Sequence, residues 1–126
     1  MKRKVLIIDA ISNYLYFIKR VLINEGYEVM ITSSEKELIS YLHNDLPDLI
    51  LVDVKLNNDQ GFEYIRKIKK ELNIETPAIV ISNGKNIKEI ERAFDYGASD
   101  YLIKPLNLRD LKNKVNASLK TAKIKE

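Results

Sequence analysis

Four short hydrophobic runs recur along the chain, at residues 5–8, 29–31, 49–52 and 78–81, and a weaker fifth run lies at 101–103. Each is continuous rather than alternating, and Val and Ile are frequent in them. Runs of this kind are typical of strands buried on both faces, as in a parallel sheet. The pattern therefore predicts five buried strands.

After each run, hydrophobic residues recur every three or four positions, the spacing of one face of an amphipathic helix. In chain order the stripes are Tyr14, Phe17, Ile18, Val21 and Leu22; Leu38, Tyr41 and Leu42; Phe62, Ile65, Ile68 and Leu72; Ile87, Ile90 and Phe94; and Leu108, Leu111, Val115 and Leu119. The sequence thus predicts a helix after every strand.

Residues at the ends of these segments support the predicted helices. Ser34 with Glu37 three positions later resembles a capping box at the start of the second helix. Asn107 is a suitable N-cap for the last helix. Gly26 and Gly97 follow the first and fourth helices, where a C-terminal glycine commonly ends a helix.

Strand–helix alternation at this spacing requires right-handed crossovers and a parallel sheet with helices on both faces. We therefore expect an α/β fold, a doubly wound three-layer sandwich. Such sheets bind ligands at the carboxyl ends of their strands. The residues that follow each strand are the first place to look for chemistry.

Composition narrows the possible functions. The chain has 126 residues, of which 45% are hydrophobic and 31% charged, as expected for one globular domain. It has no Cys and one His, which excludes disulfides, Cys-based metal or redox sites and any zinc site with two imidazoles. The longest runs without a charged residue are nine residues, against the ~20 of a membrane-spanning helix. We expect a cytoplasmic protein.

The formal net charge of +3 comes from the end of the chain, because residues 107–126 hold six basic and two acidic residues. A basic terminal helix is compatible with nucleic-acid binding. A solvated helix face or the start of a linker is the favoured interpretation. We expect no direct binding of nucleic acid.

Polar residues with complementary chemistry follow four of the predicted strands. Asp9 ends the first strand, Asp53 the third and Ser82 the fourth, and Lys104 with Pro105 follows the fifth. One polar residue at a strand end is usually a turn or cap residue. Two carboxylates, a hydroxyl and an ammonium at the same sheet edge indicate a functional site.

Four segments carry a family resemblance: VLIID, LILVDVKLNNDQGFE, AIVIS and GASDYLIKP, at 5–9, 49–63, 78–82 and 97–105. In this order and spacing they resemble the receiver domain of two-component response regulators, in the chemotaxis-regulator-like superfamily. The resemblance implies a five-stranded (βα)5 sheet with strand order 2-1-3-4-5. It also implies a receiver domain over 1–122, followed at 123–126 by a basic C-terminal tail or the start of a linker.

The resemblance implies a role for each strand-end residue. Asp53 matches the phosphoacceptor, which is phosphorylated by a sensor histidine kinase or a phosphotransfer protein. Ser82 and Lys104 match the hydroxyl and the ammonium that contact the phosphoryl group. Asp9, Asp53 and the backbone carbonyl of Lys55 match the ligands of Mg²⁺, and the Lys104–Pro105 bond matches one that is cis in the family.

The resemblance also implies a switch rather than a turnover enzyme. Tyr101 matches an aromatic position that responds to phosphorylation. The face formed by the fourth helix, fifth strand and fifth helix would then contact an output domain, a partner protein or a second copy in a homodimer.

Four residues depart from the family pattern: Asn57 and Gln60, which change the chemistry of a loop, and Ala10 and Asn83, which bear on the reaction centre. Ala10 stands where a second acidic residue is usual, and losing that charge weakens Mg²⁺ binding by up to about 4 kcal/mol. Asn83 follows Ser82 where a small residue is usual. Two hypotheses remain open: a working receiver with weak Mg²⁺ affinity, or a degenerate receiver that is a phosphorylation-independent interaction module.

Overall fold

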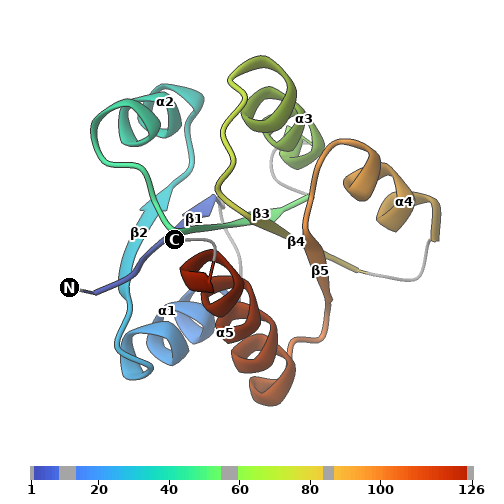
Figure 1. Ribbon diagram of the computed structural model, residues 1–126. Helices are drawn as coiled ribbons and strands as arrows, with labels where there is room; N and C mark the ends of the chain where they lie inside the picture. The colour runs from blue at the N-terminus through green and yellow to red at the C-terminus, as the bar shows by residue number, and fades with distance from the viewer. Residues whose placement is uncertain (1, 9–13, 55–59, 84–86, 125–126) are drawn as a thin grey trace.

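Strands and helices alternate in the computed structural model, which describes residues 2–8, 14–54, 60–83 and 87–124 (Figure 1). The strands are β1 (Lys4–Ile8), β2 (Glu28–Thr32), β3 (Leu49–Asp53), β4 (Ala78–Ser82) and β5 (Asp100–Ile103). The helices are α1 (Leu15–Asn24), α2 (Glu35–Asn44), α3 (Gln60–Arg66), α4 (Ile87–Asp95) and α5 (Leu108–Ile124). A π-helical segment, η1 (Lys67–Glu71), continues α3. All five predicted strands and the five predicted helices are confirmed.

The strands form one parallel sheet in the order β2-β1-β3-β4-β5, as predicted. β1 lies between β2 and β3, with Val5 opposite both Val29 and Leu49. Because every strand runs in the same direction, all carboxyl ends lie at one edge of the sheet.

Helices cover both faces of the sheet: α1 and α5 lie on one face, and α2, α3 and α4 on the other (Figure 1). Successive strand residues point to opposite faces, so β1 supplies Leu6 to the core under α2–α4 and Ile7 to the core under α1 and α5. β3 and β4 are buried along their whole length. The predicted three-layer sandwich is confirmed.

The predicted helix ends are mostly confirmed. The Glu37 N–H donates to the Ser34 Oγ at 3.1 Å, but the Ser34 N–H donates to the Thr32 Oγ1 at 3.3 Å rather than to the Glu37 carboxylate. The cap is therefore present without the reciprocal contact of a capping box. The Asp110 N–H donates to the Asn107 Oδ1 at 2.8 Å, so the predicted N-cap of α5 is present.

The two predicted C-terminal glycines are also confirmed. After α1 and α4, Gly26 and Gly97 adopt φ of +92° and +109°, which only glycine adopts at little cost.

The end of the third helix differs from the prediction. The Leu72 N–H donates to the Lys67 carbonyl, five residues earlier, at 2.9 Å, so the last turn is a π turn. A wider turn rotates Leu72 away from the face on which Ile68 is buried, and Leu72 is 37% exposed. The spacing of the stripe could not indicate this extra residue in the turn.

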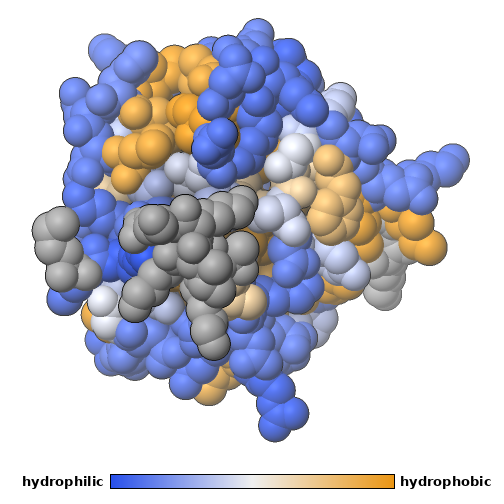
Figure 2. Space-filling model, in the orientation of Figure 1, coloured by the Kyte–Doolittle hydropathy of each residue, from blue (hydrophilic) through white to orange (hydrophobic). Residues whose placement is uncertain are grey.

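The fourth helix forms where predicted, but its hydrophobic stripe does not face the core. Ile87 is 71% and Phe94 43% exposed, whereas Ala93 is buried in the core under α2–α4. Figure 2 shows hydrophobic surface at α4. The Phe94 ring packs edge-on against Tyr101 of β5, with centroids 5.9 Å apart. The stripe therefore faces β5 and solvent.

α5 contributes Leu111, Val115 and Leu119 to the core that it shares with α1, as its stripe predicts. Its N-terminal Leu108 is exposed. Within the described part of the chain, no helix is both long and apolar enough to span a bilayer.

Candidate functional site

The sheet brings three of the predicted strand-end residues to one edge. Asp53 is the last residue of β3, Ser82 is the last residue of β4, and Lys104 directly follows β5. Backbone hydrogen bonds continue the ladder at this edge, because the Lys104 N–H donates to the Ser82 carbonyl at 2.8 Å and the Val54 N–H to the Ile81 carbonyl at 3.0 Å. Backbone hydrogen bonds therefore align the ends of β3, β4 and β5, and this alignment sets the relative positions of the three residues along the strands.

An ion pair joins two of these residues across 51 positions of sequence: the Lys104 Nζ lies 2.7 Å from the Asp53 Oδ2. The two side chains are 18% and 8% exposed. A carboxylate this deep requires compensation for its lost hydration, which the ammonium supplies. The predicted convergence of Asp53 and Lys104 is therefore present in the structure.

Ser82 has an unusual polar environment. The residue is 3% exposed, and its Oγ is buried with no hydrogen-bond partner among the described residues. An unsatisfied buried hydroxyl costs about 1–3 kcal/mol. A ligand oxygen brought to this edge would satisfy it, and the nearby ammonium favours an anionic ligand.

Gly61 lets α3 approach the end of β3. A Cβ at this position would lie 2.3 Å from the Asp53 carbonyl oxygen and 2.5 Å from the Val54 Cα. Because such distances are far below contact, any side chain there would displace the backbone of Asp53. In the sequence, Gly61 belongs to the 49–63 segment that carries the family resemblance, and this close approach is the physical reason for a glycine there.

The hydrophobic spacing places Tyr14 only on a helix face and predicts no role for it at the site. Its ring lies beside the site, with the Lys104 Nζ 5.6 Å from the ring centroid. Tyr14 immediately precedes α1, the helix that follows β1. A sequence signal existed, because a residue only a few positions after the carboxyl end of β1 must lie near this edge of the sheet.

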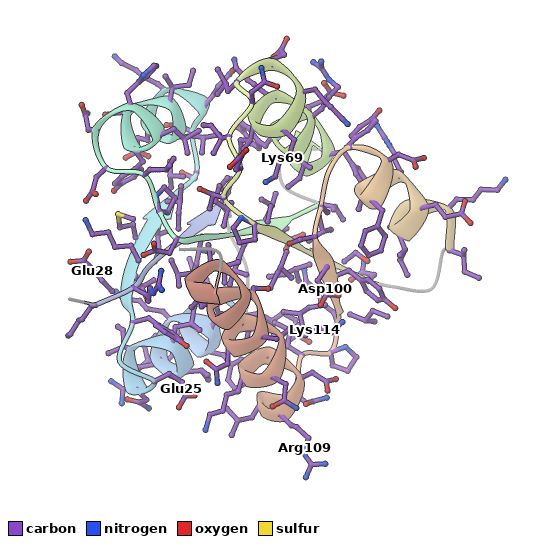
Figure 3. The ribbon with its side chains drawn as sticks, in the orientation of Figure 1. Glu25, Glu28, Lys69, Asp100, Arg109 and Lys114 are labelled. Atoms are coloured by element: carbon purple, nitrogen blue, oxygen red, sulfur yellow. The ribbon has the colours of Figure 1, made fainter. Side chains whose placement is uncertain are left out.

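Tyr101 lies on β5 and is partly buried between α4 and α5. Besides Phe94, its ring contacts the Lys114 ammonium, whose Nζ lies 4.2 Å from the ring centroid. The same Nζ donates to the Tyr101 carbonyl, and it lies 3.2 Å from the Asp100 Oδ1. Figure 3 shows Lys114 and Asp100 side by side between α5 and β5. In this structure the ring is therefore held by groups of both flanking helices.

The remaining site predictions fall largely outside the described residues. Asp9, Ala10 and Lys55 are among the residues that the structure does not describe. Asn83 is described and exposed. The Lys104–Pro105 peptide bond is cis, as the family resemblance implies.

The described residues only partly define a cation site. They contain no group of three or more Asp, Glu, His or Cys side chains that could hold a metal ion. Asp53 is a carboxylate, the ligand type that Mg²⁺ prefers, and it lies at the ligand-binding edge of the sheet. The donor chemistry of Asp53 fits Mg²⁺, with Asp9 and Lys55 as the further predicted ligands.

A separate hollow of about 330 Å³ lies between α2 and α3, away from the strand-end residues. It is lined by Glu35, Glu63, Tyr64, Arg66, Lys67 and Glu71. Its charges are already paired, Lys67 with Glu35 and Arg66 with Glu63. We therefore assign it to helix packing rather than to the functional site.

Comparison with known proteins agrees with this geometry. A family model described as the response regulator receiver domain matches residues 5–116. The response regulator ArlR of Staphylococcus saprophyticus is 33% identical over 117 residues, which cover 93% of this chain and 52% of that protein. The transcriptional regulatory protein CrdR of Helicobacter pylori is 32% identical, over 91% of this chain and 54% of that protein. This chain thus spans about half the length of these curated relatives.

Solved structures give the same result. A CheY-like response regulator receiver domain protein from Methanospirillum hungatei superposes with a TM-score of 0.87 at 28% identity, and the match covers 100% of both chains. The similarity therefore includes every strand and helix described above.

Proposed function

This chain belongs to the response regulator receiver domain family of two-component systems, a family of signalling domains, and from that premise we propose that it accepts a phosphoryl group on Asp53. The donor is a phosphohistidine of a sensor histidine kinase or of a phosphotransfer protein. The observation that carries the proposal is the 2.7 Å ion pair between Asp53 and Lys104. The buried Ser82 Oγ at the neighbouring strand end supports it.

The proposed step is a displacement at phosphorus. An Asp53 carboxylate oxygen attacks the phosphorus atom, the P–N bond to the donor imidazole breaks, and the electron pair stays on the imidazole nitrogen. The product is an acyl phosphate. Lys104 neutralises charge on the transferred phosphoryl oxygens, and the Ser82 hydroxyl donates a hydrogen bond to one of them.

Mg²⁺ is the proposed cofactor, held by Asp9, Asp53 and the backbone carbonyl of Lys55. When bound, it neutralises negative charge on the phosphoryl group. Ala10 stands where the family pattern has a second acidic residue, so we propose a weak affinity for Mg²⁺.

The proposed output surface is the α4–β5–α5 face, with Tyr101 as its switch residue. Exposed hydrophobic residues on this face are Ile87, Phe94, Ile103 and Leu108. An exposed apolar group of this kind suits contact with an output domain, a partner protein or a second copy of the chain. Phosphorylation would alter this surface by releasing Tyr101 from its contacts with Phe94 and Lys114.

The remaining assignments are proposals of the same kind. We propose that the receiver domain spans 1–122, that 123–126 begin a tail or linker, and that the protein is cytoplasmic. We also propose that the domain has no turnover activity beyond assisting its own phosphorylation and slow dephosphorylation.

The experiment is incubation with acetyl phosphate and MgCl2, followed by intact-mass spectrometry. We expect the wild-type chain to gain the mass of one phosphoryl group and Asp53→Asn to gain none. A wild type that is unmodified by acetyl phosphate or a kinase at every Mg²⁺ concentration contradicts the proposal.

Ala10 and the exposed Asn83 favour a second candidate, a degenerate receiver that binds a partner without phosphorylation. It predicts that the Asp53→Asn variant binds its partner as tightly as the wild-type chain does. Removal of Mg²⁺ should then change nothing.

A further inference from the structure

The Lys104 ammonium has two described neighbours of different kinds. Its Nζ lies 2.7 Å from the Asp53 carboxylate and 5.6 Å from the centroid of the Tyr14 ring. We propose that Tyr14 is a positioning residue, which holds the Lys104 ammonium at the Asp53 carboxylate. This inference rests on the proposed function and adds a residue to it.

Lys104 needs such support because its side chain is a flexible four-carbon stem that ends in a point charge. An ion pair to one carboxylate oxygen fixes the distance of the ammonium but leaves many conformations of the stem. The face of an aromatic ring carries negative potential and attracts a cation within about 6 Å of its centroid. A ring on a second side of the ammonium therefore restricts where the stem can place it.

Tyr14 is itself held independently of Lys104. Its carbonyl accepts a hydrogen bond from the Ile18 N–H at 2.9 Å, which fixes it to the first turn of α1. It also packs against the hydrophobic core that α1 shares with α5. The ring position is thus determined by the helix and the core, as a positioning residue requires.

A neutral ring suits this task better than a charged residue. A carboxylate at position 14 would compete with Asp53 for the ammonium, whereas the ring attracts the cation without replacing the ion pair. The same attraction persists when a phosphoryl group is attached to Asp53. Ala10 replaces an acidic residue of the family pattern, and we have proposed that Mg²⁺ binding is weak for this reason. More of the neutralisation of phosphoryl charge then depends on accurate placement of Lys104.

The test compares Tyr14→Leu, which removes the ring, with Tyr14→Phe, which keeps it. The matched control is Tyr16→Leu, two positions later in the first turn of α1, because Tyr16 is 73% exposed. We expect Tyr14→Leu to slow phosphorylation by acetyl phosphate roughly three- to tenfold, which lies within the range of a cation–π contact. Tyr14→Phe and Tyr16→Leu should keep the wild-type rate at the same Mg²⁺ concentration.

A spectroscopic readout tests the contact itself. The NMR signals of the Lys104 ε-methylene, assigned with Lys104→Arg, should carry a ring-current shift in the wild type and in Tyr14→Phe. The shift should disappear in Tyr14→Leu and stay in Tyr16→Leu. Tyr14→Met repeats the comparison with a flexible apolar side chain if leucine perturbs folding.

The proposal is overturned if the Lys104 signals do not move in Tyr14→Leu, or if they move while the phosphorylation rate stays at the wild-type value. A wild type that is never phosphorylated refutes the proposed function instead. In that case the NMR comparison alone decides whether Tyr14 positions Lys104.

Discussion

At the scale of single residues, Ser82 and Lys104 differ in whether their polar groups have a partner. The Ser82 Oγ is buried without a partner among the described residues, whereas the Lys104 ammonium is paired with a nearly buried carboxylate. Removing the Ser82 hydroxyl should therefore stabilise the folded state, and removing the Lys104 ammonium should destabilise it. Both changes should impair phosphoryl transfer, so the two residues separate function from stability.

Ser82→Ala should slow phosphorylation roughly tenfold or more, because a hydrogen bond to the phosphoryl group is lost. Its free energy of unfolding should be unchanged or up to about 1 kcal/mol higher, since a buried unsatisfied hydroxyl disappears. The matched control is Ser99→Ala, because the Ser99 hydroxyl donates to the Ala78 carbonyl at 3.0 Å. That variant should lose about 0.5–1.5 kcal/mol and keep the phosphorylation rate. Urea denaturation measures the free energy of unfolding, and mass spectrometry measures the phosphorylation rate. If Ser82→Ala were less stable than Ser99→Ala, the Ser82 hydroxyl would not be unsatisfied in the folded state.

Lys104→Met should lower the free energy of unfolding at neutral pH by about 1–3 kcal/mol, because it leaves the Asp53 carboxylate without its cation. In the Asp53→Asn background, Lys104→Met should lower the free energy of unfolding by much less, because no buried carboxylate remains to be left unpaired. A double-mutant cycle by urea denaturation measures the difference. An equal loss in both backgrounds would mean that the ion pair contributes nothing to stability.

At the scale of elements, charged side chains lie between α2 and the α3–η1 segment. Lys67 of η1 pairs with Glu35 of α2, and Tyr64 of α3 is buried beside them. Burial raises the pKa of the Tyr64 hydroxyl, the nearby Glu35 carboxylate raises that pKa further, and Lys67 lowers it. The pH dependence of this packing follows from the direction of the shift.

A raised pKa in the folded state means that the unfolded chain releases its phenol proton first as the pH rises. The stability due to neutral Tyr64 is therefore complete below pH ~10 and is lost as the pH rises through the folded pKa. Tyr64→Phe should reduce this alkaline loss, as measured by urea denaturation between neutral pH and pH ~11. Tyr27→Phe should act in the same direction, because burial also raises the pKa of Tyr27. Identical slopes in the wild type and both variants would contradict the expectation.

At the scale of the whole molecule, one sheet separates two hydrophobic cores. Ile50 and Leu51 are neighbours on β3, yet Ile50 belongs to the core under α2–α4 and Leu51 to the core under α1 and α5. Both side chains are fully buried. Since each core is completed by the same strands, neither can persist without the other.

Ile50→Ala and Leu51→Ala should each lower the free energy of unfolding by about 2–5 kcal/mol. In both variants, far-UV circular dichroism and tyrosine fluorescence should report the same urea midpoint, because the molecule unfolds as one unit. A variant in which one probe changes before the other would show that the two cores unfold separately.

The sequence alone determined the elements, their order and the edge of the sheet at which the site lies. Hydrophobic periodicity is a local property, so it predicts each strand and helix, and the caps at Ser34 and Asn107 are read from neighbouring residues. Strand ends such as Asp53 and Ser82 follow directly from those predictions. The roles given to them came from the family resemblance and remain proposals.

Only the tertiary structure decided which groups touch. The π turn that exposes Leu72 and the outward stripe of α4 depend on how a helix fits its neighbours, which periodicity does not encode. The 2.7 Å contact between Lys104 and Asp53, the ring of Tyr14 beside it and the buried Ser82 Oγ join residues from separate elements. Distances between such groups are set by the packing of the sheet and its helices, because the chain between them constrains only how far apart they can be.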